Sequence, residues 1–191
     1  MMQENFVMSK RLSKPFDKDL ERRATEKTKE LVAILNKHLT KLAASLGPGK
    51  NSDIVISCKS NPSIKVDVEV EIVREDRWKN IVSGKYPTVR WPYAKVQKCE
   101  KYSKEGKILL MLSANEGNLS EILYIDCETW VRMGHLEKAR AVRTENNKRY
   151  IYRKGGEEPF WGIEKDKVNW GIAKLEEVII NLLKEKKGVQ C

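Results

Sequence analysis

The sequence has few of the residues that bind transition metals. Its two histidines, His38 and His135, are isolated, and its four cysteines are widely spaced without a Cys-x-x-Cys pair. A structural zinc site is therefore not expected. Reduced thiols in an intracellular, cytoplasmic protein are the simplest interpretation, and disulfide bridges in an oxidising compartment are the alternative.

Long apolar segments are also absent from the sequence. No uninterrupted apolar run exceeds five residues, the length of the run at 108–112, whereas a membrane-spanning helix needs about 20. Residues 1–14 mix acidic and basic side chains without an apolar segment, so no secretory signal is expected. We predict a flexible tail over residues 1–15 and a single domain over residues 16–191.

Acidic residues are outnumbered by basic ones, and the difference is unevenly distributed. The 37 Lys and Arg residues exceed the 27 Asp and Glu residues, for a net charge of +10. Residues 1–52 carry +5 and residues 74–107 carry +6, but residues 53–73 between them carry −2. This excess favours a polyanionic partner. We expect nucleic acid, DNA before RNA, and no membrane; a homodimer is left open.

The acidic segment contains the most informative pattern in the chain. Residues 66–72 read V-D-V-E-V-E-I, so a β-strand would place Asp67, Glu69 and Glu71 on one face and the valines on the other. Like charges two residues apart on a strand repel each other. A solvated outer face would accommodate them, and so would a bound divalent cation.

Periodicity predicts the elements around this strand. Apolar residues at three- and four-residue spacing indicate a helix over 16–46, ended by the Gly-Pro-Gly of 47–49. Residues 53–57 and 64–73 predict a β-hairpin. Three elements should follow: an extended piece at 88–91, a basic helix at 93–104 and a buried strand at 107–114.

The C-terminal part is less regular. Residues 119–125 fit either a helical turn or a strand, and residues 128–131 and 139–143 are expected to be extended. Residues 150–152 and 160–163 are expected to be the two arms of a hairpin that turns at 155–156. Residues 172–186, with apolar side chains on one face, predict a closing helix.

The order of helix, hairpin, basic helix and buried strand resembles the restriction-endonuclease-like superfamily, whose core runs αβββαβ and whose motif is written PD…(D/E)-x-K. Ser52-Asp53 stands where the family has Pro-Asp, and Glu69-Val70-Glu71 stands where it has (D/E)-x-K. The resemblance covers about residues 16–114 and departs from the motif where Glu71 replaces the lysine. It implies an α/β fold with a mixed sheet between helices, followed by extra C-terminal strands and the closing helix.

The resemblance also implies a divalent-metal-dependent nuclease that hydrolyses phosphodiester bonds in DNA or RNA. Asp53 and Glu69 would hold Mg²⁺ or Mn²⁺, with Asp67 as a substitute ligand. Glu71, or a lysine from elsewhere, would orient or deprotonate the attacking water. The candidates for that lysine are Lys79 and Lys95. Glu26 and Glu30 on the first helix are candidates for a further ligand.

Basic and aromatic residues are interleaved over residues 74–107, where nucleic acid is expected to bind. Cations neutralise phosphates, and aromatic rings either stack on bases or pack in the core. For Trp78 and Trp91 the core is favoured. The candidate phosphate contacts are Arg74, Arg77, Lys79, Arg90, Lys95, Lys98 and Lys101.

Two other functions fit the same sequence. One is a catalytically inactive nucleic-acid-binding protein on a decayed nuclease fold, in which Glu71 would be a relic of the lost lysine. The other is a domain with a basic face for another kind of partner.

Overall fold

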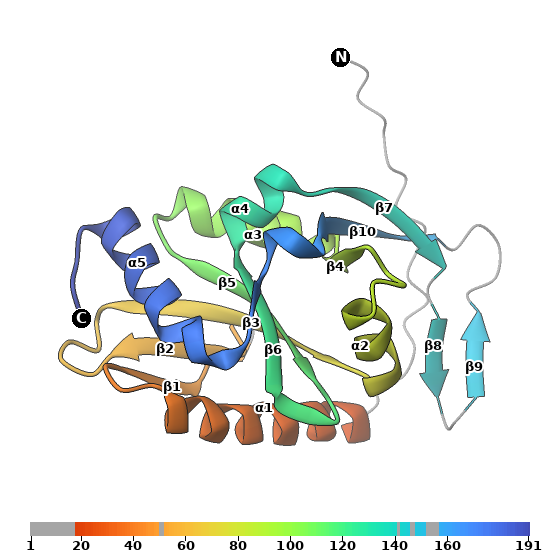
Figure 1. Ribbon diagram of the computed structural model, residues 1–191, viewed down its shortest axis with the longest axis horizontal. Helices are drawn as coiled ribbons and strands as arrows, with labels where there is room; N and C mark the ends of the chain where they lie inside the picture. The colour runs from red at the N-terminus through yellow and green to blue at the C-terminus, as the bar shows by residue number, and fades with distance from the viewer. Residues whose placement is uncertain (1–17, 50–51, 141, 146–147, 152–156) are drawn as a thin grey trace, which may run out of the picture.

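The main sheet has six strands in the order β1-β2-β3-β5-β6-β11. The computed structural model (Figure 1) describes residues 18–49, 52–140, 142–145, 148–151 and 157–191. β3 and β5 are parallel, and every other neighbouring pair in this sheet is antiparallel. The strands are β1 (Leu42–Leu46), β2 (Ile54–Cys58), β3 (Lys65–Val73), β5 (Leu109–Asn115), β6 (Asn118–Asp126) and β11 (Asn169–Trp170).

Helices cover both faces of this sheet (Figure 1). α1 (Lys18–His38) and α5 (Leu175–Lys187) pack on one face in the first hydrophobic core. α2 (Glu75–Val82), α3 (Ala94–Lys104) and α4 (Cys127–Met133) contribute to a second core on the other face. The predicted α/β class, a mixed sheet between helices, is confirmed.

The alternation along β3 assigns its side chains to the two faces. Val66 and Val68 are fully buried in the first core. The carboxylates of Asp67, Glu69 and Glu71 therefore point to the opposite face, toward α2 and α3. β5 is buried along its whole length, as is typical of a strand covered on both faces.

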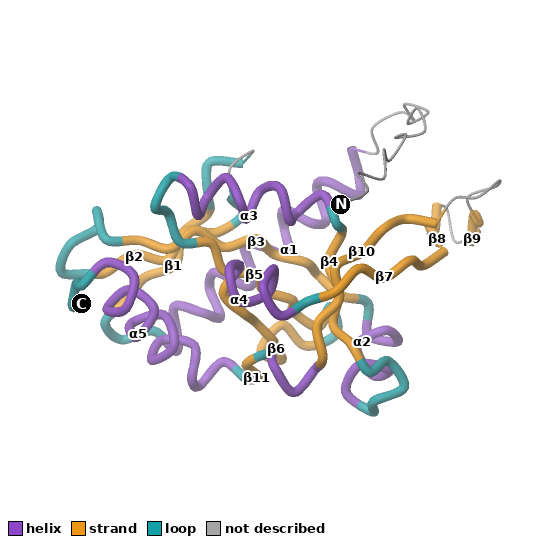
Figure 2. Tube along the Cα trace, turned by 90° about the horizontal axis from the view of Figure 1, so that it is seen from above, coloured by secondary structure: helices purple, strands orange, loops and turns teal. Residues whose placement is uncertain are grey.

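A second sheet of three strands has the order β4-β10-β7. Its strands are β4 (Thr88–Pro92), β10 (Glu157–Glu164) and β7 (His135–Arg140). β7 and β10 run together away from the main sheet (Figure 2). A separate pair is formed by β8 (Val142–Glu145) and β9 (Lys148–Ile151).

The predicted hairpin of 150–152 with 160–163 is wrong. β9 pairs with β8, whereas β10 lies between β4 and β7. Tryptophan packing holds β10 in that position: the indole N–H of Trp161 donates to the Trp130 carbonyl, and the indole N–H of Trp130 donates to the Trp161 carbonyl. Residues 155–156, the expected turn, lie outside the described part of the chain.

The prediction of one helix over 16–46 is wrong at its C-terminal end. α1 ends at His38, and Leu42–Leu46 forms β1 against β2. A separation of four residues, as between Leu42 and Leu46, fits the period of a strand as well as that of a helix. The leucine pattern alone could not separate the two.

A tertiary contact ends this helix. The Glu176 carboxylate on α5 accepts hydrogen bonds from the backbone N–H groups of Thr40, Lys41 and Leu42. The Asn36 side chain also binds both backbone groups of Ala44. These contacts satisfy N–H groups that a continued helix would have used internally.

Two short helices differ from the prediction. Residues 128–131, expected to be extended, belong to α4, whose N-cap Asp126 accepts from the N–H groups of Glu128 and Thr129. α2 was not predicted; Trp78 and Ile81, three residues apart, fix it by packing into the second core.

The remaining elements follow the prediction. The strands near 53–57, 64–73, 88–91 and 107–114, the basic helix and the closing helix are confirmed, and residues 119–125 form a strand. Trp78 and Trp91 are buried in the core. The expected tail over residues 1–15 lies outside the described residues. No helix in the described part of the chain is long and apolar enough to cross a bilayer.

The expectation of free thiols was wrong. Disulfides join Cys58 to Cys191 and Cys99 to Cys127, with Cα atoms 5.4 and 5.6 Å apart. The first ties the chain after α5 to β2, and the second joins α3 to α4. Separations of 133 and 28 residues in the sequence gave no indication of these pairs.

Introducing a charge at Val68 should unfold the domain. Its side chain is 0% exposed in the first core, and Val68→Asp should lower the free energy of unfolding by about 4 kcal/mol, because an unpaired carboxylate would be buried there. Lys65→Asp, at an exposed position of the same strand, is the matched control. Thermal melts followed by circular dichroism would measure both; equal melting temperatures would contradict the buried position of β3.

Glu176 should make stability depend on pH. Burial raises the pKa of Glu176, but hydrogen bonds from the backbone of Thr40, Lys41 and Leu42 outweigh it and hold this pKa below the ordinary value of 4.5. The charged carboxylate therefore stabilises the fold above about pH 4.5, and this contribution is lost as the pH falls through the folded pKa.

We expect Glu176→Gln to lower the free energy of unfolding at neutral pH by about 1 kcal/mol. The variant should also lose less stability than the parent on acidification to about pH 3. Urea denaturation across this range tests both expectations, with the exposed Glu185→Gln on α5 as control. An equally steep acid-induced loss in parent and variant would rule out the role of Glu176.

Candidate active site

Asp53 lies where the chain enters β2. Its backbone N–H donates to the Val68 carbonyl at 3.0 Å, and its carboxylate Oδ2 accepts the Val70 N–H at 2.8 Å. Because Ile54 pairs with Val68, this register places Asp53 opposite Glu69. Burial raises the pKa of Asp53; the Val70 hydrogen bond opposes that rise and the negative charge of Glu69 adds to it.

Glu69 is almost completely buried, with 7% of its surface exposed. Lys95 binds its Oε1 atom and Lys98 binds its Oε2 atom, and both lysines come from α3. Val96, Cys99 and Tyr102 anchor this helix in the second core, which places the two lysines over the acidic face of β3. The charge on Glu69 is thus compensated by two lysines of α3.

Glu71 has a different cationic partner. Its Oε1 atom lies 3.0 Å from Nη1 of Arg77 on α2, and Nη2 of Arg77 lies 3.5 Å from the Arg90 carbonyl oxygen. Burial raises the pKa of Glu71, while the positive charges of Arg77, Arg90 and Lys95 oppose the rise. Glu71 is therefore a partly buried carboxylate whose charge is balanced chiefly by Arg77.

Asp67 has two hydroxyl partners. Its Oδ1 atom accepts from the buried Ser52 hydroxyl at 3.2 Å. The Tyr102 hydroxyl is its second partner, and burial together with the Asp67 charge raises the pKa of Tyr102 to about 12. Both partners donate hydrogen bonds to the Asp67 carboxylate at the edge of the cluster.

The structure separates the two candidate lysines. Lys95 binds Glu69, whereas Lys79 is 72% exposed on α2 and pairs with Glu75 at 2.7 Å. Of the candidate ligands on α1, Glu30 pairs with Lys27, and the buried leucines of this helix belong to the first core on the far face of the sheet. Neither Glu26 nor Glu30 joins the carboxylates of β3.

The other predicted phosphate contacts are distributed around the cluster and have acidic neighbours. Each of these ion pairs joins a basic residue to a nearby carboxylate: Arg74 to Asp76 at 2.8 Å, Arg90 to Glu137 at 3.8 Å and Lys101 to Glu105 at 3.9 Å. Lys101 is the most exposed of the three, on the outer side of α3.

Asp53 and Glu69 are the adjacent carboxylates that a divalent cation could use. The described residues contain no group of three or more His, Cys, Asp or Glu side chains arranged for a metal. Mg²⁺, however, usually retains several waters and needs only one or two protein carboxylates when substrate phosphate completes its coordination. Burial raises the pKa of Asp53, and a bound cation would favour its charged form. The pair therefore fits Mg²⁺ or Mn²⁺ with few protein ligands.

Sequence reasoning did not foresee the contact between Lys98 and Glu69, nor that between Arg77 and Glu71. A signal for the first was present, since Lys95 and Lys98 are three residues apart and so share one face of a helix. No comparable signal pointed to Arg77, because α2 itself was not predicted.

Comparison with solved structures finds a similar fold in Hjc, a Holliday junction resolvase from the archaeal hyperthermophile Archaeoglobus fulgidus. The match has a TM-score of 0.45 and 14% sequence identity, and covers 82% of this chain and 95% of that one. No protein-family model matches the sequence, and no curated protein matches it. The order αβββαβ expected from the sequence is present in α1, β1, β2, β3, α3 and β5, with α2 and β4 inserted between β3 and α3.

Substitutions of the two adjacent carboxylates should have opposite effects on stability. Asp53→Asn keeps an acceptor for the Val70 N–H and removes a desolvated charge, so in metal-free buffer at neutral pH it should raise the free energy of unfolding. Glu69→Gln should lower it by about 2 kcal/mol, because two lysines lose their anionic partner.

The pH dependence gives a second check. A raised folded pKa means that the folded state binds the proton of Asp53 more tightly than the unfolded state does, so this group adds stability as the pH falls through that pKa. Asp53→Asn should lack this contribution. Urea denaturation in EDTA would measure both variants. Loss of stability in Asp53→Asn equal to that in Glu69→Gln would contradict the assignment of Asp53.

Proposed function

We propose that this protein is a divalent-metal-dependent nuclease that hydrolyses phosphodiester bonds, with DNA as the expected substrate and RNA as the alternative. The observation that supports this proposal is the meeting of Asp53, Glu69 and Lys95 from β2, β3 and α3. Two carboxylates beside an ammonium group suit the binding of a cation and a phosphate at one place.

The cation would be Mg²⁺ or Mn²⁺, held by Asp53 and Glu69. When bound, it would neutralise charge on the scissile phosphate and lower the pKa of an attacking water. Asp67 would support the site through Ser52 and Tyr102 rather than bind the cation directly, since both of these groups donate to its carboxylate.

Lys95 would take the position of the motif lysine that Glu71 replaces. Its ammonium group lies on Glu69, close enough to the proposed site to orient water or to contact a phosphate oxygen. Glu71 is the candidate proton acceptor, because its burial moves its pKa upward, toward the neutral range where a general base works best.

Nucleic acid would approach over α3 and β4. Lys98 and Lys101 on α3 and Arg90 on β4 surround the carboxylates with positive charge, and Arg74 and Lys79 on α2 extend it. Each such contact would position the phosphate backbone without reading sequence. Affinity should therefore decrease as salt increases.

A non-catalytic nucleic-acid-binding protein is the second candidate. The observation in its favour is that Lys95 and Lys98 occupy both carboxylate oxygens of Glu69, so this charge is balanced without a metal. In that case binding to nucleic acid would be salt-sensitive and indifferent to Mg²⁺.

Comparing Lys95→Ala with Lys79→Ala tests the proposed catalysis. In a plasmid-nicking assay with Mg²⁺ or Mn²⁺, Lys95→Ala should lose activity by about 100-fold or more, the usual contribution of a residue that handles the attacking water. Lys79→Ala removes the same charge from an exposed position on α2; it should at most weaken DNA binding and should keep the cleavage rate at saturating DNA. Equal activity of both variants would exclude Lys95 from the chemistry.

The metal also has a readout that needs no cleavage. Mn²⁺ should raise the melting temperature of the parent, because it binds the folded state preferentially. The rise should be absent in Asp53→Ala. If Mn²⁺ leaves the melting temperature of the parent unchanged while DNA binding persists, the binding-only function is supported instead.

A further inference from the structure

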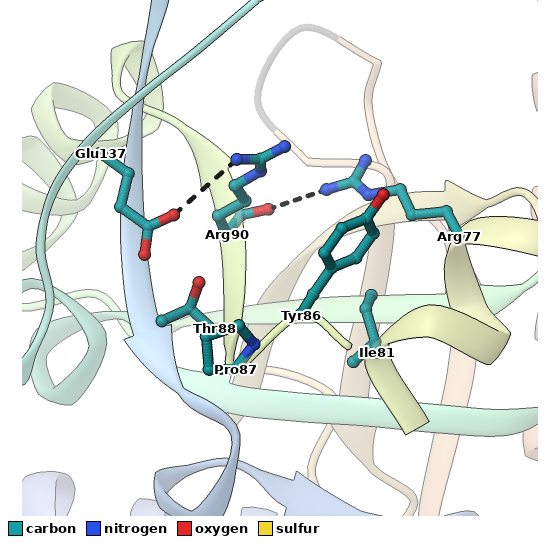
Figure 3. A pocket seen from close by; sticks show the side chains of 7 residues that line it. All are labelled: Arg77, Ile81, Tyr86, Pro87, Thr88, Arg90 and Glu137. Atoms are coloured by element: carbon teal, nitrogen blue, oxygen red, sulfur yellow. Dashed lines mark hydrogen bonds and ion pairs between the residues drawn. The ribbon is translucent and has the colours of Figure 1, made fainter. Parts of the chain in front are cut away.

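A pocket of about 290 Å³ has in its wall Arg77 (Figure 3), the residue that also binds Glu71 of the carboxylate cluster. It opens between α2, β4 and β7. Seven residues line it: Arg77, Ile81, Tyr86, Pro87, Thr88, Arg90 and Glu137. None of them has a role in the proposed hydrolysis other than contact with the phosphate backbone.

We propose that this pocket binds one unpaired nucleobase, preferentially guanine, from a strand whose backbone crosses the Asp53 and Glu69 carboxylates. This proposal rests on the proposed function in assuming that nucleic acid is the ligand. It adds a base-binding site next to the site of hydrolysis.

Arg77 connects the two sites. One of its terminal nitrogens binds Glu71 and the other faces the Arg90 carbonyl oxygen, so its guanidinium forms a shared wall (Figure 3). A strand positioned by the lysines of α3 would thus have an adjacent pocket for one of its bases. Proteins that read an unpaired base commonly hold it between an aromatic or apolar surface and groups that bind its polar edge.

The pocket has the apolar surface that such a base needs. Tyr86 is 40% exposed, and its ring stands over the cavity with Ile81 and Pro87 nearby (Figure 3). An aromatic ring can stack on any base. The Arg90 guanidinium is held in place by packing over the Phe160 ring, 4.8 Å from its centroid.

Glu137 distinguishes a base from a phosphate. Its Oε2 atom lies 3.8 Å from Nη1 of Arg90, its Oε1 atom lies 3.1 Å from Nε2 of His135, and the carboxylate faces the cavity (Figure 3). A phosphate bound there would be repelled by this carboxylate, whereas a base with N–H donors would be bound by it. The pocket therefore combines cationic donors and one anionic acceptor around an apolar surface.

Guanine matches this arrangement better than the other bases. It presents the acceptors O6 and N7, which arginine binds, and it carries the 2-amino donor. Its ring N1–H is a second donor beside that amino group, so one carboxylate can accept both. Adenine and cytosine each place an acceptor next to their amino group. This acceptor would face the Glu137 carboxylate, which is itself an acceptor, and the two would repel each other.

Gly162 supports the assignment of Glu137 to the pocket wall. A Cβ atom at this position on β10 would lie 2.3 Å from Oε1 of Glu137. Only the absence of a side chain leaves room for the carboxylate where it is. Gly162→Ala should thus displace the Glu137 carboxylate without changing the charge of the protein.

Fluorescence anisotropy in EDTA tests the proposal separately from cleavage. The probes are short thymine oligonucleotides that carry one central guanine, adenine or hypoxanthine. We expect the parent to bind the guanine probe about tenfold more tightly than the adenine probe, the lower end of the range for one well-formed base contact. Hypoxanthine, which lacks the 2-amino group, should be intermediate.

The variants separate stacking from recognition. Tyr86→Ala should weaken binding of every probe by about tenfold, and Tyr86→Phe should retain it. Glu137→Gln and Gly162→Ala should abolish the preference for guanine. Glu185→Gln, which makes the same change in net charge as Glu137→Gln at an exposed position of α5, should preserve the preference.

Each outcome decides one of the two proposals. Salt-sensitive binding with equal affinity for all three probes would overturn the base pocket and leave the proposed nuclease intact. A guanine preference that disappears in Glu137→Gln supports the pocket even if no variant cleaves DNA. Binding of none of the probes would overturn both proposals.

Discussion

The buried carboxylate of Glu69 and its two lysine partners are the interaction on which the rest of this structure depends. A single buried charge in a sheet would cost several kcal/mol, and here the compensation comes from α3 rather than from a neighbouring strand. Because both lysines lie on the same helix, the contact also fixes the rotation of α3 above the sheet. The burial of Val96, Cys99 and Tyr102 on the adjoining face reinforces that position.

The same contact gives the site its chemical character. Lys95 and Lys98 reach Glu69 because α3, the last element of the connection between the parallel strands β3 and β5, packs on the face to which the carboxylates of β3 point. Asp53 reaches that face through the antiparallel pairing of β2 with β3. The stability of the fold and the proposed phosphate chemistry therefore depend on the same residues.

Charges of alternating sign continue from this cluster to the pocket. Glu69 binds lysines, Glu71 binds Arg77, and Arg90 lies near Glu137. The cations that bind these carboxylates come from α3, α2 and β4 in turn, so charged side chains continue from β3 to β7. This alignment is the structural basis for the proposal that the backbone of a strand and one of its bases are bound side by side.

The sequence by itself determined the local elements whose pattern has one interpretation. The alternation over residues 66–72 predicted β3 and the face of its carboxylates, and the apolar spacing predicted α3 and α5, because burial on one side imposes these periods.

Only the tertiary structure decided the rest. The spacing from Leu42 to Leu46 fits two periods, so contacts with β2 and Glu176 were needed to make it a strand. The sequence around Lys79 and Lys95 did not show which of the two lysines reaches the carboxylates. Only the path of α3 brings Lys95 to Glu69. Contacts between residues far apart in the chain depend on how the elements pack and not on their local pattern.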